Sequence, residues 1–510
     1  MQFPNANPNA AGSGVSAQQL LYLYSYNQAG RVTLQFLRLA AANSAWAPTD
    51  VYATYTWDNM GRMTGLNYPL SGPQNTMTYD AMSNLSSATQ STCQTWVQYP
   101  NWVCQTWGSP TPLASASYNF AGQLTALNYN YSGGWQTEAH TYNGMMQLTN
   151  ITNSAPSGTQ SLNMTYNFST TQNNGRIVSL VDAVTGENVS YTYDSLNRLI
   201  AAATTGTGGV QWGESYSYDG FGNLTSKVPT KGTAPQVYPQ VNSATNQARM
   251  TGDYGFDANG NWLGVPTPQM ILNTWNVENQ LISNGAVDGS GNLLTYTYDP
   301  WGKRVLQYSV CARCSQGSGT LYFYSITGQR LGSYQLNDYP PEYGGIIALT
   351  PMYIPQYFGR RMLVATDRLG SVRNSQNGSM AYFPWGEERT TTPDGTDKFA
   401  TYFRDATNNG VGQDYAKARY YNNNFGRFWS VDPGGIATAN PKNPGSWNRY
   451  AYSRNDPANF RDPTGLDDVA DGGDDSDEPI FSITVWGSPI GVSICMINPG
   501  ACQSDLRERG

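Results

Sequence analysis

Few residues of this chain belong to the types that usually carry out chemistry. His140 is the only histidine among the 510 residues, so a Ser-His-Asp or Cys-His nucleophile system would depend on it alone. It lies in the segment EAHTYNGMMQL, a degenerate repeat, and we expect it to be a strand residue. The sequence holds no G-x-x-x-x-G-K-[ST] phosphate loop, and its glycine clusters suit hairpin turns. Carboxylates and cysteines therefore remain as candidates.

Three aspartates near the C-terminal end each precede a proline: Asp432, Asp456 and Asp462. Two carboxyls held close together cannot both ionise. Such a pair can therefore combine an ionised base that activates water with a protonated acid that polarises a carbonyl. Asp-Pro is also a common turn former. From spacing alone, the favoured interpretation is that these aspartates close corners of the chain.

The cysteines fall into three close pairs, which are Cys93 with Cys104, Cys311 with Cys314, and Cys495 with Cys502. Local pairing of every cysteine favours disulfides in an oxidising compartment over free thiols. The C-x-x-C of CARC is alternatively half of a zinc site or a redox motif. A lone C-x-x-C in a chain with one histidine disfavours zinc. We predict neither a metal nor another cofactor.

An internal repeat indicates the elements that would position such groups. One sequence motif recurs along the chain. It consists of alternating aromatic and Thr or Ser residues, then Asp or Asn, a few small residues, Gly, Arg or Asn, and finally an apolar residue. Clear copies are YTWDNMGRMTGL, YTYDSLNRLIAA, YSYDGFGNLTSK and YTYDPWGKRVLQ, which begin at Tyr55, Tyr191, Tyr216 and Tyr296. Between several neighbouring copies the step is about 24 residues.

Each copy predicts a β-hairpin. In YTYD, Tyr191 and Tyr193 point to one face of a strand and Thr192 to the other. Asp194 then caps a turn through its side chain, and a Gly or Asn a few positions later takes the left-handed conformation. One hairpin cannot bury its own face, so stacked copies form a continuous sheet. The predicted fold is all-β, a spiralling sheet of hairpins; a β-propeller or an outer-membrane barrel fits the repeat length and patterning less well.

Composition supports this class and excludes others. Charged residues are only 12% of the chain, whereas it has 53 Gly, 36 Tyr and 14 Trp, a mixture typical of β-sheets with tight turns. The net charge of −7 argues against nucleic-acid binding. No apolar run is long enough to predict a membrane span. The first residues, MQFPNANPNAAGSGVSAQQ, have no signal-peptide pattern, so we expect another export route or a fragment of a longer protein.

The YxYDxxGRL repeats resemble the YD repeats of RHS proteins, of teneurins and of the C components of insecticidal Tc toxins. The resemblance spans roughly residues 20–466 and is most specific after residue 355. There YFGRRMLVATDRLGSVRNSQNGSMAYFPWGEE, ARYYNNNFGRFWSVDP, NRYAYSRNDPANF and RDPTGL look like the RHS repeat-associated core. The resemblance implies a sheet wound into a hollow cocoon around a toxic C-terminal polypeptide. Complete shells of this kind are usually longer, which favours a partial shell.

Repeats and resemblance together divide the chain into four parts. We expect a disordered N-terminal segment over 1–18, the YD-repeat β shell over 19–354, the repeat-associated core over 355–466, and a variable tail over 467–510. The tail opens with DDVADGGDDSDEP, which reads as a solvated acidic linker, and continues as a short β segment without a convincing catalytic cluster. It suits a degenerate or truncated effector, or a small export or interaction peptide.

The resemblance also assigns roles in the core. Segments similar to this one are self-cleaving aspartyl proteases that cut after the Leu of DPxGL. By motif, Asp432 and Asp462 would form the acid–base pair, Arg427 would position or tune it, and the bond cut would join Leu466 to Asp467. The chain departs from the family in reading RYYNNN where RYYDP is frequent, and in carrying the insertion IATANPKNPGSW. Neither change removes a proposed catalytic residue.

The predicted function is a secreted bacterial RHS-type shell that encloses its own C-terminal effector polypeptide and releases it by cleavage in cis. No activity in trans is expected. The resemblance implies an immunity protein and secretion machinery as partners, and a secreted or cell-surface location. The alternative is a non-enzymatic adhesion or carbohydrate-contact module that uses exposed aromatic and Asn faces of the repeats. A C-terminal mass loss that depends on Asp432 and Asp462 would separate the two.

Overall fold

The computed structural model describes residues 2–3, 18–41, 49–70, 72–97, 103–131, 134–249, 252–264, 273–287, 293–310, 318–338, 347–408, 411–435, 444–466 and 468–470. Within these ranges strands dominate and no α-helix occurs, so the predicted all-β class is confirmed. Among the same residues, no helix has the length and apolar character needed to span a bilayer.

The first sheet has 17 strands, nearly all paired antiparallel with the next strand along the chain. They are β1 (Gln2–Phe3), β2 (Gln18–Tyr26), β3 (Val32–Ala41), β4 (Thr49–Trp57), β5 (Met63–Asn67), β6 (Gln74–Tyr79), β7 (Leu85–Ser91), β10 (Thr111–Tyr118), β11 (Leu124–Tyr131), β12 (Gly134–Tyr142), β13 (Leu148–Ser154), β14 (Gln160–Phe168), β15 (Ile177–Asp182), β16 (Glu187–Tyr193), β17 (Leu199–Thr205), β18 (Trp212–Tyr218) and β19 (Leu224–Gly232). The one skip is at β7, which pairs with β10, while β8 (Cys93–Val97) and β9 (Val103–Trp107) form a separate hairpin between them.

The repeat turns follow the predicted chemistry. Strands β16 and β17 form a hairpin in which Asp194 Oδ1 accepts the backbone N–H groups of Leu196 and Arg198, both at 2.9 Å. Asn197 has φ +63°, in the left-handed region that Asn tolerates. The turn from Asp58 to Arg62 repeats these contacts, with a Gly instead of Asn at φ +81°.

Neighbouring repeats are joined by the second aromatic residue of each YxYD phrase. Its polar atom donates to the carbonyl of the residue that begins the return strand of the preceding hairpin. Tyr79 donates to Met63, Tyr193 to Ile177, and Tyr298 to Leu281, at 2.6 to 2.8 Å. Because each repeat is fastened to the one before it, the hairpins stack edge to edge as one curved sheet.

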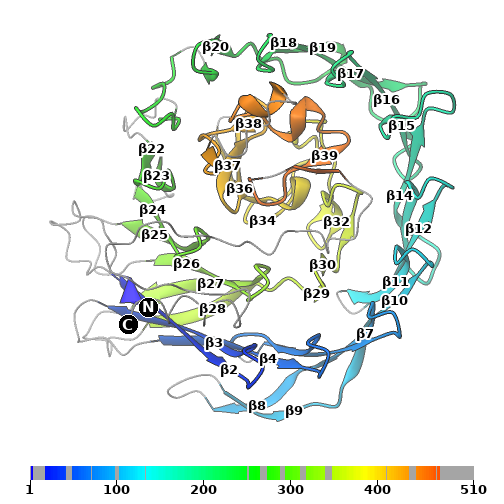
Figure 1. Ribbon diagram of the computed structural model, residues 1–510. Helices are drawn as coiled ribbons and strands as arrows, with labels where there is room; N and C mark the ends of the chain where they lie inside the picture. Colours follow the sequence, from blue (N-terminus) through cyan, green and yellow to red (C-terminus); the bar gives the residue numbers. More distant parts are fainter. Residues whose placement is uncertain are drawn as a thin grey trace, which may run out of the picture.

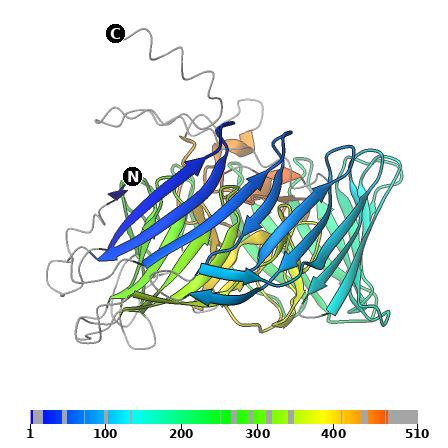
Figure 2. The same ribbon diagram turned by 90° about the horizontal axis from the view of Figure 1, so that it is seen from below.

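A small hairpin of β20 (Gln240–Asn242) and β21 (Gln247–Arg249) leads to a second meander sheet. Its seven strands are β22 (Asn273–Trp275), β23 (Leu281–Val287), β24 (Leu293–Tyr298), β25 (Arg304–Val310), β26 (Ser318–Tyr324), β27 (Arg330–Asp338) and β28 (Ile347–Tyr353). Together the two sheets curve into a wall that closes on itself as a ring, with β27 and β28 beside β2 and β3 (Figure 1). Figure 2 shows the same wall as a band of slanted strands.

The ring closes through a shared hydrophobic cluster. Leu37 and Leu39 of β3 and Leu321 and Leu336 of the second sheet are fully or almost fully buried in it. The Gln35 amide nitrogen donates to the Tyr324 carbonyl at 3.0 Å, across 289 positions of sequence. The two ends of the wall are thus held by packing and a side-chain hydrogen bond.

The core segment, residues 355–466, lies inside the ring (Figure 1). With the three residues described after it, it contains short strands and 3-10 turns: β29 (Tyr357–Phe358), β30 (Arg361–Met362), β31 (Ala365–Thr366), β32 (Val372–Ser375), β33 (Gly378–Ser379), β34 (Thr396–Asp397), η3 (Phe399–Thr401), β35 (Phe403–Asn408), β36 (Val411–Ala416), β37 (Arg419–Asn422), β38 (Arg427–Phe428), η5 (Pro444–Trp447), η6 (Ser453–Asn455), β39 (Phe460–Arg461) and β40 (Val469–Ala470). Its apolar side chains share buried clusters with the wall. Trp385 and Phe428 pack with Trp212, and Phe358 packs with Leu127.

Ion pairs also fasten the core segment to the wall. They join a wall residue to a core residue at six places: Glu138 to Arg361, Arg176 to Asp456, Glu187 to Arg389, Lys227 to Glu387, Arg304 to Asp405, and Arg330 to Asp397. An unpaired buried charge costs several kcal/mol. These pairs therefore favour the observed position of the core segment over positions shifted along the wall, in which the charges would lose their partners.

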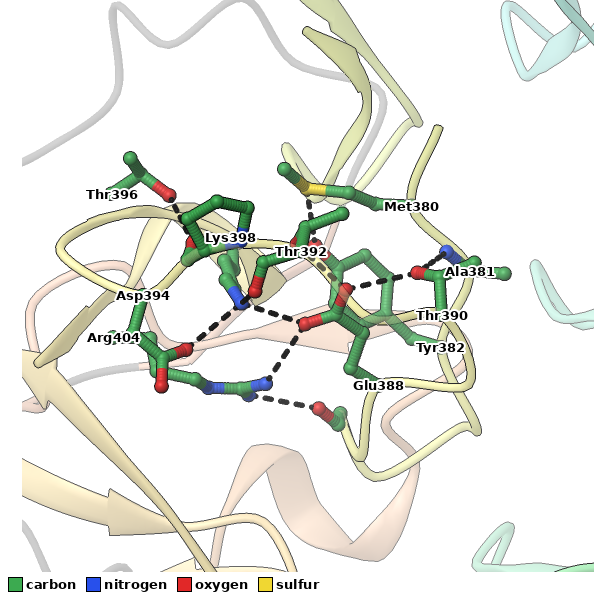
Figure 3. Close-up of polar contacts among 12 residues, drawn as sticks. Met380, Ala381, Tyr382, Glu388, Thr390, Thr392, Asp394, Thr396, Lys398 and Arg404 are labelled. Atoms are coloured by element: carbon green, nitrogen blue, oxygen red, sulfur yellow. Dashed lines mark hydrogen bonds and ion pairs between the residues drawn. The ribbon is translucent and has the colours of Figure 1, made fainter. Parts of the chain in front are cut away.

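A polar network inside the core segment fixes its own loops (Figure 3). Lys398 Nζ donates to Glu388 Oε2 at 2.7 Å, to Asp394 Oδ1 at 2.9 Å and to the Thr392 carbonyl at 3.0 Å. Arg404 pairs with Asp414 through two of its nitrogens, at 2.6 and 2.8 Å. Arg404 Nη1 also lies 3.7 Å from Glu388 Oε2, so the loop between β33 and β35 is tied to the five-stranded sheet of β34 to β38.

Two predicted segments are largely outside the described residues. Gln2 and Phe3 of the predicted N-terminal segment form β1 against β2, and residues 4–17 are outside the description. Of the predicted tail, residues 468–470 are described, and Val469 and Ala470 form β40 against β39.

Candidate active site

The segment RDPTGL folds into a turn built on the Asp462 side chain. Asp462 Oδ1 accepts the backbone N–H of Leu466 at 2.9 Å and that of Thr464 at 3.3 Å. Gly465 takes φ +73°, and a Cβ there would lie 2.7 Å from the Ala416 carbonyl oxygen, so only glycine fits. The Asp462 carboxyl is thereby held beside the backbone of Leu466, the residue after which cleavage was predicted.

This turn is the same one that the repeats use, with acceptor contacts two and four residues along the chain. The predicted corner-closing role of Asp462 is therefore present in the structure. What differs is the environment. The Asp462 residue is 3% exposed, and its main-chain carbonyl accepts the hydroxyl of Tyr402, which is fully buried.

Asp432 reaches the same place from the chain after β38. Its Oδ1 accepts the Gly434 N–H at 2.7 Å, and its own N–H donates to the Arg449 carbonyl at 3.1 Å. The residue is 8% exposed. A turn and a neighbouring segment thus position its carboxyl, leaving Oδ2 directed toward Arg419.

Arg419 lies between the two carboxyls. Its Nη2 atom is 3.2 Å from Asp462 Oδ2 and 3.9 Å from Asp432 Oδ2. Asp462 Oδ2 and Asp432 Oδ2 are therefore neighbours of the same nitrogen atom. The other guanidinium nitrogens bind backbone: Nε donates to the Gly465 carbonyl, and Nη1 donates to the Arg449 carbonyl at 3.1 Å. Arg419 therefore binds both carboxyls and the peptide just before Leu466.

Burial dominates the electrostatics of Asp462. It raises the pKa of this carboxyl to about 7, although Arg419 and the backbone donors of Leu466 and Thr464 act in the opposite direction. At neutral pH a substantial fraction of Asp462 therefore keeps its proton. A protonated carboxyl can donate to a carbonyl oxygen, as the acid of an acid–base pair must.

Arg427, predicted to tune this pair, has its guanidinium elsewhere. Its Nη2 donates to the Asn246 carbonyl at 2.6 Å and approaches Asn223 Oδ1 at 3.4 Å, both on the wall. Burial lowers its pKa to about 10. The structure thus brings Asp432 and Asp462 together around Arg419, while Arg427 joins the core segment to the wall.

Sequence reasoning did not single out Arg419, although a signal was present. Arg419 opens the run RYY, in which every residue is buried, on strand β37. A buried Arg in such a run needs a carboxylate partner.

The other candidates have structural partners. Asp456 is fully buried, and its Oδ2 accepts from Arg176 of the wall at 2.8 Å; burial raises its pKa to about 6. His140 is a strand residue on β12, with Nε2 2.6 Å from Glu138 Oε1. Neither residue has a described contact with Asp432 or Asp462.

The structure supports one of the predicted cysteine pairs. Cys93 and Cys104 form a disulfide across the β8–β9 hairpin. Cys311, Cys314, Cys495 and Cys502 lie outside the described residues, as does Asp467 on the far side of the predicted scissile bond.

A cavity of about 210 Å³ lies between the wall and the core segment next to this site. Pro463 and Arg461 line it from the core side, and His140 and Leu148 from the wall side. A polar lining and this volume give room for water. The cavity thus extends to Pro463, the residue after Asp462.

Comparisons with known proteins agree with this architecture. A curated relative, the tRNA3(Ser)-specific nuclease WapA of Bacillus spizizenii, is 26% identical over 282 residues, which cover 49% of this chain and 11% of that protein. Among solved structures, TcdB2-TccC3-Cdc42 matches with a TM-score of 0.62 at 19% identity, over 88% of this chain and 24% of that chain. The Photorhabdus luminescens Tc holotoxin pore matches with a TM-score of 0.64 at 18% identity, over 88% and 23%.

At these identities the solved structures show the fold alone, and the chain spans less than a quarter of the length of each of these three proteins. The sequence profile of the teneurin YD-shell family matches residues 105–458, which is more than half of the chain. The predicted resemblance to YD-repeat proteins is thereby confirmed, and the chain belongs to the teneurin YD-shell family.

Proposed function

We propose that this chain is the core-bearing section of an RHS-type toxin shell that encloses a C-terminal effector polypeptide and releases it by cleaving itself after Leu466. One observation carries the proposal. Arg419 Nη2 contacts both Asp462 and Asp432, and the same guanidinium holds the Gly465 carbonyl. Two acids and the peptide bond immediately before Leu466 therefore meet at one buried point inside the ring.

The proposed reaction is peptide hydrolysis by an aspartate pair. Asp432 takes a proton from a water molecule, whose oxygen attacks the Leu466 carbonyl carbon. Asp462, protonated in part at neutral pH, donates a proton to the carbonyl oxygen. The C–N bond to Asp467 then breaks, and the departing nitrogen receives a proton.

Arg419 acts as a positioning residue in this scheme. Its Nη2 contacts both carboxyls, and its Nε–H binds the Gly465 carbonyl of the peptide before Leu466. The turn around Asp462 supplies the rest of the alignment, because the Leu466 N–H is held at 2.9 Å from Oδ1. Holding the reacting groups in one geometry before reaction is a large part of catalysis.

A denaturing gel and intact mass of the purified chain test this function. The wild type is expected to lose residues 467–510, and Asp432→Asn or Asp462→Asn to remain full length. Asp456→Asn is the matched control, because Asp456 is another buried aspartate before a proline, and it pairs with Arg176 instead. A wild type that stays intact after folding, or cleavage that survives Asp462→Asn, contradicts the proposal.

The adhesion alternative draws less support from the fold. It needs rows of exposed aromatic rings, yet Tyr55, Tyr129, Tyr166 and Tyr216 of the repeats are at most 4% exposed. They face the core segment or the opposite part of the wall. Exposed aromatics such as Phe120 and Phe221 lie singly at turns, which is ordinary for a protein surface.

The proposed context follows from the family. We infer a secreted or cell-surface location, an export machinery, and an immunity partner for the released polypeptide. The relative WapA is named for nuclease activity on a tRNA. Whether the polypeptide after Leu466 has an activity of that class is tested by assaying the purified chain and its released C-terminal product for cleavage of tRNA.

A further inference from the structure

A buried lysine lies between two buried glutamates where the wall meets the core segment. Lys227 of β19 and Glu214 of β18 are 0% exposed, and Glu387 of the core segment is 7% exposed. Lys227 Nζ contacts Glu387 Oε1 and donates to the Asn423 carbonyl at 3.1 Å. The candidate self-cleavage chemistry uses none of these three residues.

The sheet register explains how the three groups meet. Tyr216 pairs directly with Lys227 across β18 and β19, so both side chains lie on the same face. Glu214 is two residues before Tyr216 and shares that face, where its Oε2 accepts the Tyr216 hydroxyl at 2.7 Å. Glu387 arrives from a tight turn of the core segment, whose Phe383 N–H donates to the Glu387 carbonyl at 2.9 Å.

The surroundings are mostly aromatic. Trp212, Tyr216, Phe383 and Trp385 belong to the same buried cluster, with the Tyr216 and Trp385 rings 6.0 Å apart. Glu387 Oε2 and Glu214 Oε1 are buried without a hydrogen-bond partner in the described structure. Lys227 Nζ thus contacts Glu387, Glu214 lies on the same face of the sheet, and each carboxyl has one oxygen without a hydrogen-bond partner among the described residues.

Such a cluster cannot hold all its charges. Ionising both carboxyls would leave one of them uncompensated in an apolar site. Burial lowers the pKa of Lys227 to about 7 and raises that of Glu214. Burial thus disfavours the charged amine of Lys227 and the ionised form of Glu214, and amide formation requires a neutral amine.

Lys398, a buried lysine of the core segment, has a complete set of hydrogen-bond acceptors. Its Nζ donates to three acceptors, from Glu388, Asp394 and Thr392, at 2.7 to 3.0 Å (Figure 3). All three ammonium hydrogens are thereby used. Glu387 and Glu388 are consecutive residues that contact different lysines: Lys398 has three hydrogen-bond acceptors, and Lys227 has two among the described residues.

We propose that Lys227 and Glu387 condense into an intramolecular isopeptide bond that joins the wall to the core segment, with Glu214 as the proton relay. The Lys227 Nζ lone pair attacks Cδ of the protonated Glu387 carboxyl, so a C–N bond forms and a C–O bond breaks. Glu214 gives its proton to the leaving hydroxyl, which departs as water, and takes one from Nζ. Glu214 ends unchanged, and no oxidant or reductant is needed.

The product suits the site better than the reactants do. A neutral amide replaces the amine and the carboxyl, and its N–H can still donate to the Asn423 carbonyl that Nζ contacts now. Exclusion of water protects the amide from hydrolysis. The bond links residues 160 positions apart, so the core segment stays in the wall whether or not the chain is cut after Leu466. The inference goes beyond the proposed function and does not depend on self-cleavage.

Peptide mapping of the folded, purified full chain tests the bond. Trypsin cuts after Arg198, Lys231, Arg373 and Arg389 but not after an acylated Lys227. The expected product is therefore 199–231 joined to 374–389, lighter by one water molecule than the two peptides together. Quantitative recovery of free 199–227 and 374–389 from folded wild type would show a buried ion pair only and overturn the proposal.

Variants separate the roles of the three residues. Lys227→Met abolishes the joined peptide, whereas Lys398→Met, the matched buried lysine, retains it. Glu214→Gln is expected to slow its formation about 100-fold or more, the size of a lost acid–base group. Formation at the wild-type rate in Glu214→Gln would refute the relay. If Lys227→Met fails to fold, the wild-type map alone still decides whether the bond exists.

Discussion

Arg304 of the wall reaches Asp405 of the core segment with two nitrogens of its guanidinium, and Nη2 lies 2.6 Å from Asp405 Oδ1. The Arg304 side chain is fully buried and the Asp405 side chain is 5% exposed. The rings of Tyr322 and Tyr415 lie 4.6 and 4.5 Å from the guanidinium carbon. A bidentate ion pair within an aromatic cage thus joins the second sheet to the core segment.

Removing one partner of this pair should cost far more than removing a partner of an exposed one. Arg304→Met leaves Asp405 buried without its cation, and we expect a loss of about 3–5 kcal/mol in the free energy of unfolding. Arg38→Met is the matched control. Arg38 makes a bidentate pair with Asp50, but its side chain is 40% exposed, so the loss should stay within about 1 kcal/mol. Urea unfolding followed by tryptophan fluorescence measures both, and equal losses would contradict the account.

The pKa of Asp462 predicts how self-cleavage depends on pH. The proposed acid works only while protonated, and its pKa of about 7 means that the proton is lost as pH rises through neutrality. The cleavage rate should therefore fall above about pH 7. Cleavage assayed across buffers by intact mass checks this, and a rate that keeps rising with pH would exclude Asp462 as the acid.

The same pKa predicts a stability effect of defined sign. The folded pKa of about 7 is above the unfolded value, so at intermediate pH the folded chain holds a proton that the unfolded chain has lost. The free energy of unfolding then falls as pH rises between about 4 and about 7. In an Asp432→Asn background, which keeps the chain intact, a further Asp462→Asn change should flatten this part of the pH dependence. Parallel curves for the two chains would argue against the raised pKa.

Arg419 should affect the pKa of Asp462 as well as the geometry of the site. Its positive charge lowers the pKa of Asp462, so Arg419→Met is expected to move the high-pH limit of cleavage to higher pH while reducing the rate. Arg419→Lys keeps the charge but not the fork that binds the Gly465 and Arg449 carbonyls, so it should reduce the rate without that pH shift. A purely structural arginine would lower the amount of folded protein and leave the pH profile unchanged.

The repeats were predictable because their determinants are local. The alternation of Tyr191, Thr192 and Tyr193 sets the strand faces, and Asp194 with Asn197 sets the turn, all within a few residues. The pairing of Cys93 with Cys104 also followed from spacing, since two strands of one hairpin bring them together.

The details of the site were not predictable, because they depend on which distant segments meet. Arg419 and Arg427 both lie in motif-like runs. Arg419 contacts the Asp432 and Asp462 carboxyls only because β37 packs against the Asp462 turn. Arg427 meets Asn246 of the wall because the core segment is enclosed by the ring. The periodicity of the sequence carries no information about contacts between segments that are far apart in the chain.

The close fit of the core segment yields a last prediction, from two glycines with the same backbone requirement. Gly426 has φ +62° and Gly158 has φ +83°. Alanine at either position would therefore lower the free energy of unfolding by about 1 kcal/mol, because it disfavours a left-handed backbone. At Gly158 an added Cβ meets nothing within 4 Å, whereas at Gly426 it would lie 2.4 Å from the ring of Trp385, which is completely buried. Gly426→Ala should therefore lose about 1–3 kcal/mol more than Gly158→Ala, the usual cost of overpacking a core. Urea midpoints of the two variants measure the difference. Equal midpoints would mean that the Trp385 ring can move aside. The core segment would then be packed less tightly than its ion pairs and aromatic contacts indicate.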